Sequence, residues 1–488
     1  MRKYWIEAKL EDMLEYIQPS NYIVDSVKYS DNYKIPVLTA GKTFILGYTN
    51  EKHNIFSEVP VIIFDDFTTA TKFVNFRFKV KSSAMKILIP TSNLVNLKYV
   101  FYYMQTIRHN TDTHKRYWIS IFSKLGIKIA PLPEQRAIVT KIEELFSKLD
   151  NGIDNLKKAK EKLQIYRQAV LKKAFEGDLT KEWRDQQADL PSAEELLEKI
   201  KKERENYYEE QLKDWKKAVS EWEANGKVGK RPSKPKMREF KSILDSKEVL
   251  ELSDLPKNWF YNFLAYSGEL GRGKSKHRPR NDSILFGGKY PFIQTAEVKA
   301  QDVIMEYSQT YSDFGLAQSK LWPKGTLCIT IAANIAETGF LGIDACFPDS
   351  VVGFTPFESI IDKRYIDYFF KFAKMKISSW APATAQKNIN LNILENIIIP
   401  YCCLKEQIQV VSEIETRLSV CDNVITNIDE GLEKAEALRQ SILKKAFEGR
   451  LLSKEELEVC RRECDWETAE KLLDRIKNEK KEGTKYEQ

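Results

Sequence analysis

The sequence predicts an α+β protein with two mixed α/β domains and two long helices packed as an antiparallel coiled coil, related by a pseudo-twofold internal repeat. Two observations carry this prediction. Residues 134–179 and 406–451 align without a gap and are identical at 22 of 46 positions, so the chain is built as two related halves. The segment before each copy contains short strand-like runs and one helical run.

Each copy of the repeat has the pattern of one long helix. Apolar residues recur every seven positions with charged residues between them, which is typical of a coiled-coil seam. One helix cannot bury such a stripe alone, so we expect the two copies to pack against each other. Gly177 and Gly449 are predicted to cap the helices in the left-handed conformation. The predicted seam residues are Ile142, Leu149, Leu156, Leu163, Val170, Val411, Ile414, Leu418, Cys421, Ile425, Ile428, Leu432, Ala435 and Ile442.

Length and composition set broad limits. A chain of 488 residues is expected to form two to four domains. The net charge of +7 is only mildly basic. Neither a membrane span nor a signal peptide is visible, which predicts a cytoplasmic protein. The seven cysteines form no CxxC pair, so we expect neither a zinc site nor a disulfide framework.

The first domain, residues 1–131, reads as a mixed α/β unit opened by Trp5. Residues 61–64 and 73–80 are predicted strands; in the second, Phe76, Phe78 and Val80 alternate with two cationic residues. A helix is expected to start near Asn96. The first long helix then occupies residues 132–180.

A charged helix and a flexible, basic linker are predicted over residues 181–255. The second domain, residues 256–404, repeats the plan of the first, with Trp259 in the place of Trp5. The second long helix follows at 405–453, and residues 454–488 form a charged helical tail. Within the linker, residues 225–236 contain Gly, Pro and Lys but no apolar periodicity.

The motif GELGRGKS at 268–275 fits the phosphate-binding loop GxxxxGK[ST]. Such a loop needs a helix immediately after it, so that backbone N–H groups can hold phosphates. Pro279 and the Gly287–Gly288 pair oppose that helix. These residues disfavour a phosphate-binding site. A phosphate-loop ATPase is kept as a rival hypothesis, which predicts nucleotide binding that depends on Lys274.

The same place is informative as charge. Cations alternate with other residues from 272 to 280, and such a loop can lie along a DNA backbone and offer arginines to guanine. Polar and aromatic clusters elsewhere in both domains suit the same task, although a solvated loop is the simplest alternative for each. The candidate DNA-binding residues are Thr39, Lys42, Thr43, Tyr48, Thr49, Asn50, Thr68, Thr69, Lys72, Lys115, Arg116, Tyr117, Arg272, Lys274, Lys276, Arg278, Arg280, Gln294, Thr295, Asn334, Thr384, Gln386, Lys387 and Asn388.

Two enzyme classes are disfavoured. Methylation of an extruded adenine would need an (N/D)PP(Y/F)-type motif, and no two prolines are adjacent. A metal-dependent nuclease would need clustered carboxylates and a lysine, which Asp282, Glu297 and Lys299 imitate only weakly. We therefore predict no catalytic residue and no metal site in this chain.

The chain closely resembles the specificity subunits of type I restriction-modification systems, the HsdS family, over essentially its whole length. The resemblance is carried by the domain order, the duplicated helix ending in LKKAFEG, the KHRPRND and GGKYPFIQT stretches, and the SAEELL helix with its copy near 468. It implies that each variable domain is a target-recognition domain that reads one half of a bipartite DNA site, and that the paired helices space the two.

The resemblance also implies partners and cofactors. Two modification subunits would dock on the helical repeats and carry S-adenosylmethionine and adenine-N6 methylation, while restriction subunits would add ATP- and Mg²⁺-dependent translocation and cleavage. This chain would be a non-catalytic, DNA-reading scaffold. At the helix ends, the candidate partner-binding residues are Lys172, Lys173, Phe175, Lys444, Lys445 and Phe447.

One position departs from the repeat: Pro133 corresponds to Lys405, so we expect the chain to enter the second helix at a different angle. The main rival from another class is a coiled-coil adaptor that binds protein rather than DNA. That rival leaves the arginine-rich loop unexplained.

Overall fold

The computed structural model describes residues 3–39, 43–107, 117–237, 252–332, 334–379 and 389–486. It divides into two compact units, each described here by itself. Unit 1 contains residues 1–159 and 427–488, and unit 2 contains residues 160–426. Each unit therefore joins one mixed α/β domain to the start of one long helix and the end of the other.

The two long helices are α4 (Leu132–Phe175) and α11 (Leu404–Phe447). They begin and end at equivalent residues of the repeat, so the substitution of Lys405 for Pro133 does not shift the start of the second helix. Gly177 and Gly449 have φ angles of +80° and +72°, which confirms the predicted left-handed caps.

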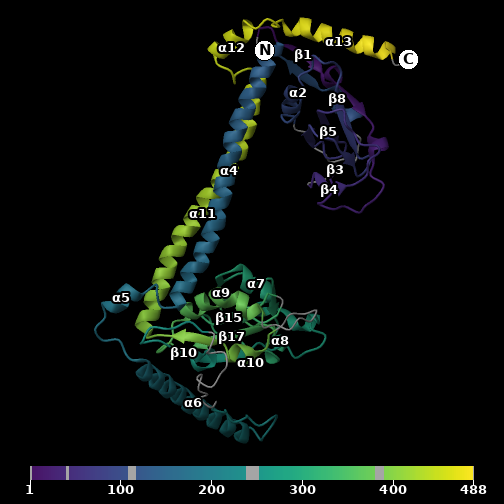
Figure 1. Ribbon diagram of the computed structural model, residues 1–488. Helices are drawn as coiled ribbons and strands as arrows, with labels where there is room; N and C mark the ends of the chain where they lie inside the picture. The colour runs from purple at the N-terminus through teal and green to yellow at the C-terminus, as the bar shows by residue number, and fades with distance from the viewer. Residues whose placement is uncertain are drawn as a thin grey trace. The chain divides into compact units, whose positions relative to one another are not determined.

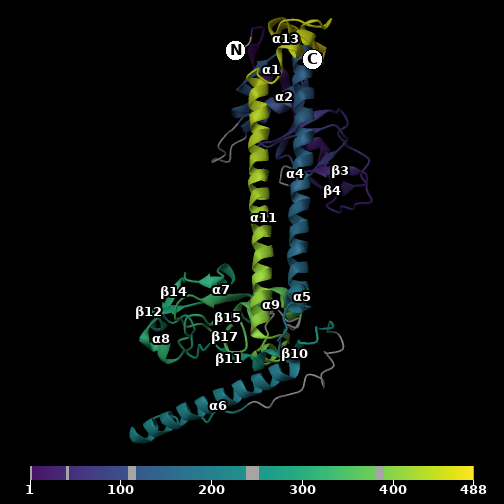
Figure 2. The ribbon, with the colours of Figure 1, turned by 90° about the vertical axis from the view of Figure 1, so that its left-hand side faces the viewer.

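The helices pair in antiparallel fashion within each unit, side by side in Figures 1 and 2. In unit 1, Arg439 of α11 lies 4.4 Å from the ring centroid of Phe146 and forms an ion pair with Asp150 of α4. In unit 2, Arg167 of α4 forms an ion pair with Asp422 of α11. Every predicted seam residue is buried or half-buried, which confirms the coiled-coil prediction.

In the first domain, one antiparallel sheet has the order β2-β8-β5-β6, and a smaller sheet has the order β4-β3-β7. A separate pair, β1-β9, closes the domain. The strands are β1 (Ile6–Lys9), β2 (Leu14–Ile17), β3 (Ile35–Leu38), β4 (Ile45–Thr49), β5 (Val61–Asp65), β6 (Thr71–Val74), β7 (Lys79–Val80), β8 (Met85–Pro90) and β9 (Gly126–Ile129). The short helices are α1 (Leu10–Met13), α2 (Leu97–Met104) and α3 (Tyr117–Ser120).

The second domain has a five-stranded sheet of order β11-β17-β15-β16-β13, with the pairs β12-β14 and β10-β18 beside it. The strands are β10 (Phe260–Phe263), β11 (Gly268–Arg272), β12 (Phe286–Phe292), β13 (Val303–Ile304), β14 (Gln309–Tyr311), β15 (Leu327–Thr330), β16 (Thr338–Leu341), β17 (Val351–Pro356) and β18 (Ile398–Tyr401). The helices are α7 (Thr295–Ala300), α8 (Asp313–Ala317), α9 (Lys363–Ser379) and α10 (Leu391–Glu395).

The two domains share one core plan. The order β2-β8-β5-β6 corresponds strand by strand to β11-β17-β15-β16. The closing pairs also correspond, since Ile6 faces Ile129 in one and Phe260 faces Tyr401 in the other. The domains differ mainly in the insertion after the first core strand, which is residues 18–60 in the first domain and 273–326 in the second.

The first domain corrects one strand prediction. Residues 73–80 form the end of β6 and, after a break, the two-residue strand β7. Phe78 and Val80 are buried, as the alternation predicted, but Phe76 is exposed and Lys79 is fully buried, so the alternation fails at these two positions. The predicted helix is confirmed as α2, whose N-cap Asn96 accepts a hydrogen bond from the Tyr99 N–H at 3.1 Å.

Each long helix ends against an aromatic helix of a domain. Phe447 of α11 packs edge-on against Tyr99 and Tyr103 of α2, with ring centroids 5.1 and 5.0 Å away. Phe175 of α4 makes the matching contact with Tyr365 of α9 at 5.1 Å. The domain that starts one long helix therefore also holds the end of the other, in both units.

Charged helices complete the units. α5 (Lys181–Asp185) and α6 (Ala193–Ala224) belong to unit 2, and α12 (Lys454–Arg461) and α13 (Ala469–Tyr486) to unit 1. Ile200 of α6 and Ile476 of α13 are equivalent and both buried. Among the described residues, no helix is long and apolar enough to cross a membrane.

We expect Phe447→Ala to lower the free energy of unfolding of unit 1 by about 3–5 kcal/mol, because it removes a buried aromatic ring and leaves a cavity. Urea denaturation would measure the loss, and hydrogen exchange would locate it in α2 and the end of α11. Ile165→Ala, at a side chain that is 70% exposed, is the control and should change stability little. Loss of protection in the second domain instead would contradict the assignment.

Candidate nucleic-acid interface

The sheet topology of the first domain brings several loops to one end. β2 and β5 both run antiparallel to β8, with Ile17 facing Ile87 and Asp65 facing Met85. Both strands therefore end where β8 begins. The insertion leaves from the end of β2, and the turn of residues 66–70 leaves from the end of β5. We call this end of the sheet the loop edge.

The second domain has the same loop edge. β11 and β15 run antiparallel to β17, and both Arg272 and Thr330 lie opposite its first two residues. Residues 272–280, which we call the basic loop, therefore begin at this edge, beside the turn that joins β15 to β16. Because the strand orders correspond, Thr68 and Asn334 occupy equivalent turns.

In each domain, one further described residue is hydrogen-bonded to the loop edge. The N–H of Tyr117 donates to the carbonyl of Asp66 at 3.2 Å, and the N–H of Ile389 donates to the carbonyl of Ile331 at 2.9 Å. These two residues immediately follow segments 108–116 and 380–388, which lie outside the described residues. The described residues that follow these two segments, Tyr117 and Ile389, therefore lie at the loop edge of their domains.

In the first domain, the described candidates differ in exposure. Thr43, Asn50, Thr68 and Lys72 are exposed, and Thr39, Tyr48 and Thr69 are half-buried. Thr49 and Tyr117 are 1% exposed, so we no longer expect their side chains to contact DNA. The hydroxyl of Thr68 donates to Asp65 at 2.6 Å, which fixes the turn. Lys42, Lys115 and Arg116 lie outside the described residues.

In the second domain, the predicted alternation of the basic loop is observed. The five cations are exposed, while Gly273 and Ser275 between them are buried. Gln294, Thr295 and Asn334 are half-buried, and Gln294 is the N-cap residue of α7. Thr384, Gln386, Lys387 and Asn388 lie outside the described residues. The exposed cations are Arg272, Lys274, Lys276, Arg278 and Arg280.

The basic loop is held in place by polar contacts. The Gln318 side chain accepts hydrogen bonds from the N–H groups of Lys276 and His277 at 2.6 and 2.8 Å. His277 Nε2 lies 2.8 Å from Asp282 Oδ2, and this hydrogen bond lowers the pKa of the Asp282 carboxyl. The loop is therefore ordered before it meets a ligand, which lowers the entropic cost of binding.

The same region tests the phosphate-loop hypothesis. Residues 268–272 form strand β11, and the first helical turn after it is a 3₁₀ turn at Ser283–Leu285. No α-helix lies within residues 276–294, all of which the structure describes, so no helix N-terminus directs backbone N–H groups at a phosphate. The structure therefore gives the GELGRGKS motif no phosphate-binding geometry.

All three arginines of the loop have partners within the protein. Arg272 Nε donates to the carbonyl of Asp349 at 2.5 Å. Arg280 Nη2 lies 2.7 Å from Asp349 Oδ2, and Arg278 Nη1 donates to the carbonyl of Ser275 at 2.7 Å. Contact with an anionic ligand would exchange these partners. Sequence reasoning missed Asp349, because it lies 69 residues from Arg280 and no local pattern marks the pair.

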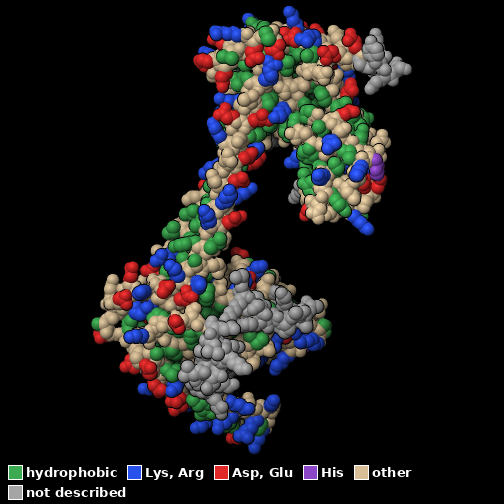
Figure 3. All heavy atoms as spheres, viewed as in Figure 1, with side chains coloured by type: hydrophobic (Ala, Val, Ile, Leu, Met, Phe, Trp, Pro, Cys, Tyr) green, Lys and Arg blue, Asp and Glu red, His purple; other side chains and the backbone are tan. Residues whose placement is uncertain are grey.

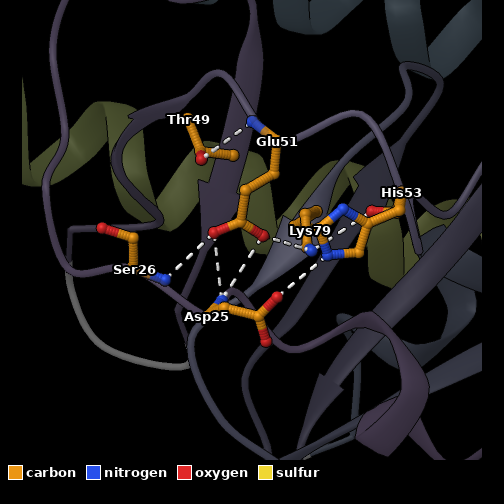
Figure 4. A network of polar contacts seen from close by, with 6 residues as sticks. All are labelled: Asp25, Ser26, Thr49, Glu51, His53 and Lys79. Carbon is orange, nitrogen blue, oxygen red and sulfur yellow. Dashed lines mark hydrogen bonds and ion pairs between the residues drawn. The ribbon is translucent and has the colours of Figure 1, made fainter.

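A polar network organises the insertion of the first domain (Figure 4). The Glu51 carboxylate accepts hydrogen bonds from the N–H groups of Asp25 and Ser26, at 3.1 and 3.0 Å, and from Lys79 Nζ at 2.5 Å. Burial raises the pKa of Glu51, but the hydrogen bonds from Lys79 and Ser26 outweigh it, so the pKa lies below its usual value. The network fixes the strand end that carries the candidate Asn50.

Asp25, Glu51 and His53 also bring three metal-donor atoms within 4.8 Å of one another. The Glu51 carboxylate is neutralised by a buried ammonium, however, and His53 Nε2 contacts Asp25 at 2.9 Å. A divalent cation would lie beside the Lys79 charge, which Coulomb repulsion opposes. We assign the cluster a structural role.

Known proteins show what this architecture resembles. A family model described as "Type I restriction modification DNA specificity domain" matches residues 2–164 and 267–434. The chain is 30% identical over 454 residues to the specificity subunit of the type I restriction enzyme EcoR124I/EcoR124II of Escherichia coli, with 88% of this chain and 90% of that protein covered. It is 22% identical over 389 residues to the EcoBI specificity subunit of the same organism, with 78% and 70% covered.

Solved structures share the fold. A chain from a structural study of complex assembly and conformational transition of the type I R-M system has a TM-score of 0.60 at 14% identity, with 92% of this chain and 98% of that chain covered. The HsdS subunit from Thermoanaerobacter tengcongensis has a TM-score of 0.50 at 15% identity, with the same coverage.

We expect Glu51→Gln to destabilise the first domain by about 3–5 kcal/mol at neutral pH, because it leaves the buried Lys79 ammonium without a counter-ion. The folded-state pKa of Glu51 lies below its ordinary value of 4.5. Its stabilising effect is therefore present above about pH 4.5 and is lost as the pH falls through the folded-state pKa.

Urea denaturation from pH 7 down to pH 3 would measure this effect, with wild type and variant converging at the acid end. Asp25→Asn is the control, because that carboxylate is exposed to solvent. A difference that persists at acid pH would mean that the glutamate acts through packing rather than charge.

Proposed function

Because the chain belongs to the family of type I restriction-modification specificity subunits, we propose that it reads a bipartite, asymmetric DNA site, one half with each mixed α/β domain. The chain itself would perform no catalysis. It would be the DNA-reading scaffold of an adenine-N6 methyltransferase and of a type I restriction endonuclease.

The observation that carries this proposal is the repeated loop edge. In both domains, the insertion and the core hairpin turn leave the same end of a four-stranded core of the same strand order, and Tyr117 and Ile389 are hydrogen-bonded to that turn. The residues of the insertions and turns differ between the domains, although the strand order does not. Recognition of two different half-sites would require two similar domain cores that present different polar side chains, and this is the arrangement of the two domains.

The chemistry of the loops supports base readout. Arginines at exposed positions of an ordered loop can pair bidentately with guanine, and Asn334 with adenine. The lysines of the same loop can neutralise phosphates. Each arginine gives up a partner within the protein on binding, so a wrong base would leave both the arginine and its former partner unsatisfied.

The long helices support assembly with other subunits. Several large apolar side chains remain exposed on them in unit 2, which marks a surface for protein contact. They are Ile165, Tyr166, Ile408, Val420 and Val424. Lys172, Lys173, Lys444 and Lys445 are exposed at equivalent helix ends. We propose these helices as docking sites for two modification subunits, whereas Phe175 and Phe447 are buried within the fold.

S-adenosylmethionine would enter the complex with the modification subunits, and ATP and Mg²⁺ with the restriction subunits. An adaptor that binds only proteins would use the same helices, but it gives no role to the ordered cations of the loop edge.

We expect co-expression of this chain with its modification subunit to place N6-methyladenine at a split sequence motif with one methylated adenine on each strand. Single-molecule sequencing of the host genome would read the motif directly. Exchange of residues 256–404 for those of another specificity subunit should change one half of the motif only. A stable complex that leaves no methylation motif would favour the adaptor.

We expect Arg278→Ala and Arg280→Ala each to cost about 1–3 kcal/mol of binding to the recognised duplex and to relax discrimination at one base pair. Fluorescence anisotropy on matched and mismatched duplexes would measure both effects. Lys324→Ala is the control, because Lys324 is exposed before β15 at the opposite end of the sheet. An equal loss on every duplex, with a shallower salt dependence, would assign these arginines to phosphates instead.

A further inference from the structure

The second half of α6 and the chain that follows it form a hairpin, in which one arm is helical and the other is extended. After Ala224 the chain reverses through Gly226, Lys227 and Gly229, whose φ angles are +75°, +62° and +85°. Residues 227–237, which we call the strap, then run back along the helix. The segment interpreted from sequence as a basic spacer therefore has a defined path on α6.

Two tryptophans hold the strap. Trp222 Nε1 donates to the carbonyl of Gly229 at 3.3 Å, and Trp215 Nε1 donates to the carbonyl of Pro232 at 3.1 Å. They lie seven residues apart and so share one face of the helix. Pro232 and Pro235 restrict the strap to extended backbone, which keeps its side chains spread along the hairpin.

Charge is sharply divided along this element. Residues 193–212 contain four Lys or Arg and seven Asp or Glu, a net charge of −3. Residues 213–236, which we call the basic hairpin, contain eight Lys or Arg and three Asp or Glu, a net charge of +5. The whole chain carries +7, so this short segment has a net charge close to that of the entire protein.

The cations of the basic hairpin face solvent. All eight are exposed, and Figure 3 shows Lys and Arg side chains gathered at the far end of α6. Among the described residues, none of the eight forms an ion pair with a carboxylate. A surface that served solubility alone would mix both signs. The eight residues are Lys213, Lys216, Lys217, Lys227, Lys230, Arg231, Lys234 and Lys236.

The hairpin lies against the second domain within unit 2. Lys236 and Tyr208 line a cavity of about 210 Å³ together with Gly268 and Glu269 of β11. Tyr207 of α6 donates to Glu269 at 2.6 Å. β11 continues to Arg272, where the basic loop of the loop edge begins. One strand of the second domain therefore links the strap to the candidate DNA-reading loop.

We propose that the basic hairpin is a second, sequence-independent contact with duplex DNA, which binds backbone phosphates beside the half-site read by the second domain. The choice of DNA rests on the proposed function, whereas the exposed cations and their fixed arrangement rest on the structure alone. Such a contact would add affinity on any sequence and would leave base discrimination to the loop edge.

The test uses the full chain in complex with its modification subunit and two duplexes, one with and one without the methylated motif. The variant replaces all five strap cations: Lys227→Gln, Lys230→Gln, Arg231→Gln, Lys234→Gln and Lys236→Gln. The control keeps the charge with Lys227→Arg, Lys230→Arg, Arg231→Lys, Lys234→Arg and Lys236→Arg. Binding would be measured between about 50 and 200 mM salt, the range over which phosphate contacts change affinity most visibly.

On the duplex without the motif, we expect the slope of log K against log salt to fall by about 0.9 for each phosphate that the variant no longer neutralises, roughly 2–4 in total. Affinity at low salt should fall at least about tenfold, and the control should bind as the wild type does. The ratio of affinities for the two duplexes should stay the same or rise.

Unchanged slopes on both duplexes would overturn the proposal. Loss of the modification subunit from the variant, with unchanged DNA binding by the chain that remains, would overturn it in favour of an acidic protein surface as the partner. If the wild type showed no sequence preference, the proposed function would fail, but the slopes on the duplex without the motif would still decide the role of the hairpin.

Discussion

The rest of the structure depends on the burial of one apolar stripe. Each 44-residue helix carries a seam that water would solvate badly, and neither helix has enough other chain around it to cover that seam. The two copies of the repeat therefore cover each other. Because they pair in antiparallel fashion, the start of one helix meets the end of the other. That meeting places Phe447 on the aromatic helix of the first domain and Phe175 on that of the second.

Features of the fold that have local or periodic causes could be predicted from the sequence. Heptads identify the long helices, glycines identify their ends, and Asn96 identifies the start of α2. Features caused by distant partners could not be read in this way. Lys79 is buried because Glu51 reaches it across the domain, and Arg280 is held by Asp349 from another strand connection. The exposed cations of the basic loop could be predicted, but Thr49 and Tyr117 show that a polar residue near a loop can belong to the core.

The two domains show how one core can support different surfaces. The shared four-stranded order needs only apolar strand residues, and its strand ends fix where loops emerge. The insertion of each domain is then stabilised by contacts of its own, through Glu51 and Lys79 in one and through Gln318 and the His277–Asp282 pair in the other. Neither set of contacts involves the closing strand pair or the long helices, so each insertion can differ in sequence while the shared core stays the same.

The division of each unit between distant parts of the chain has a consequence during synthesis. Unit 1 needs residues 427–488 as well as 1–159, so the ribosome must first add all of residues 160–426 before the matching part of α11 begins. At about 5–20 residues per second, this takes roughly 13–53 s. Throughout that interval the first part of α4 and the aromatic face of α2 are without the partners that cover them in the finished protein. The nascent chain therefore exposes apolar surface of α4 and α2 while the second domain is being synthesised. A chain that terminates early within the second domain lacks the part of α11 that completes unit 1.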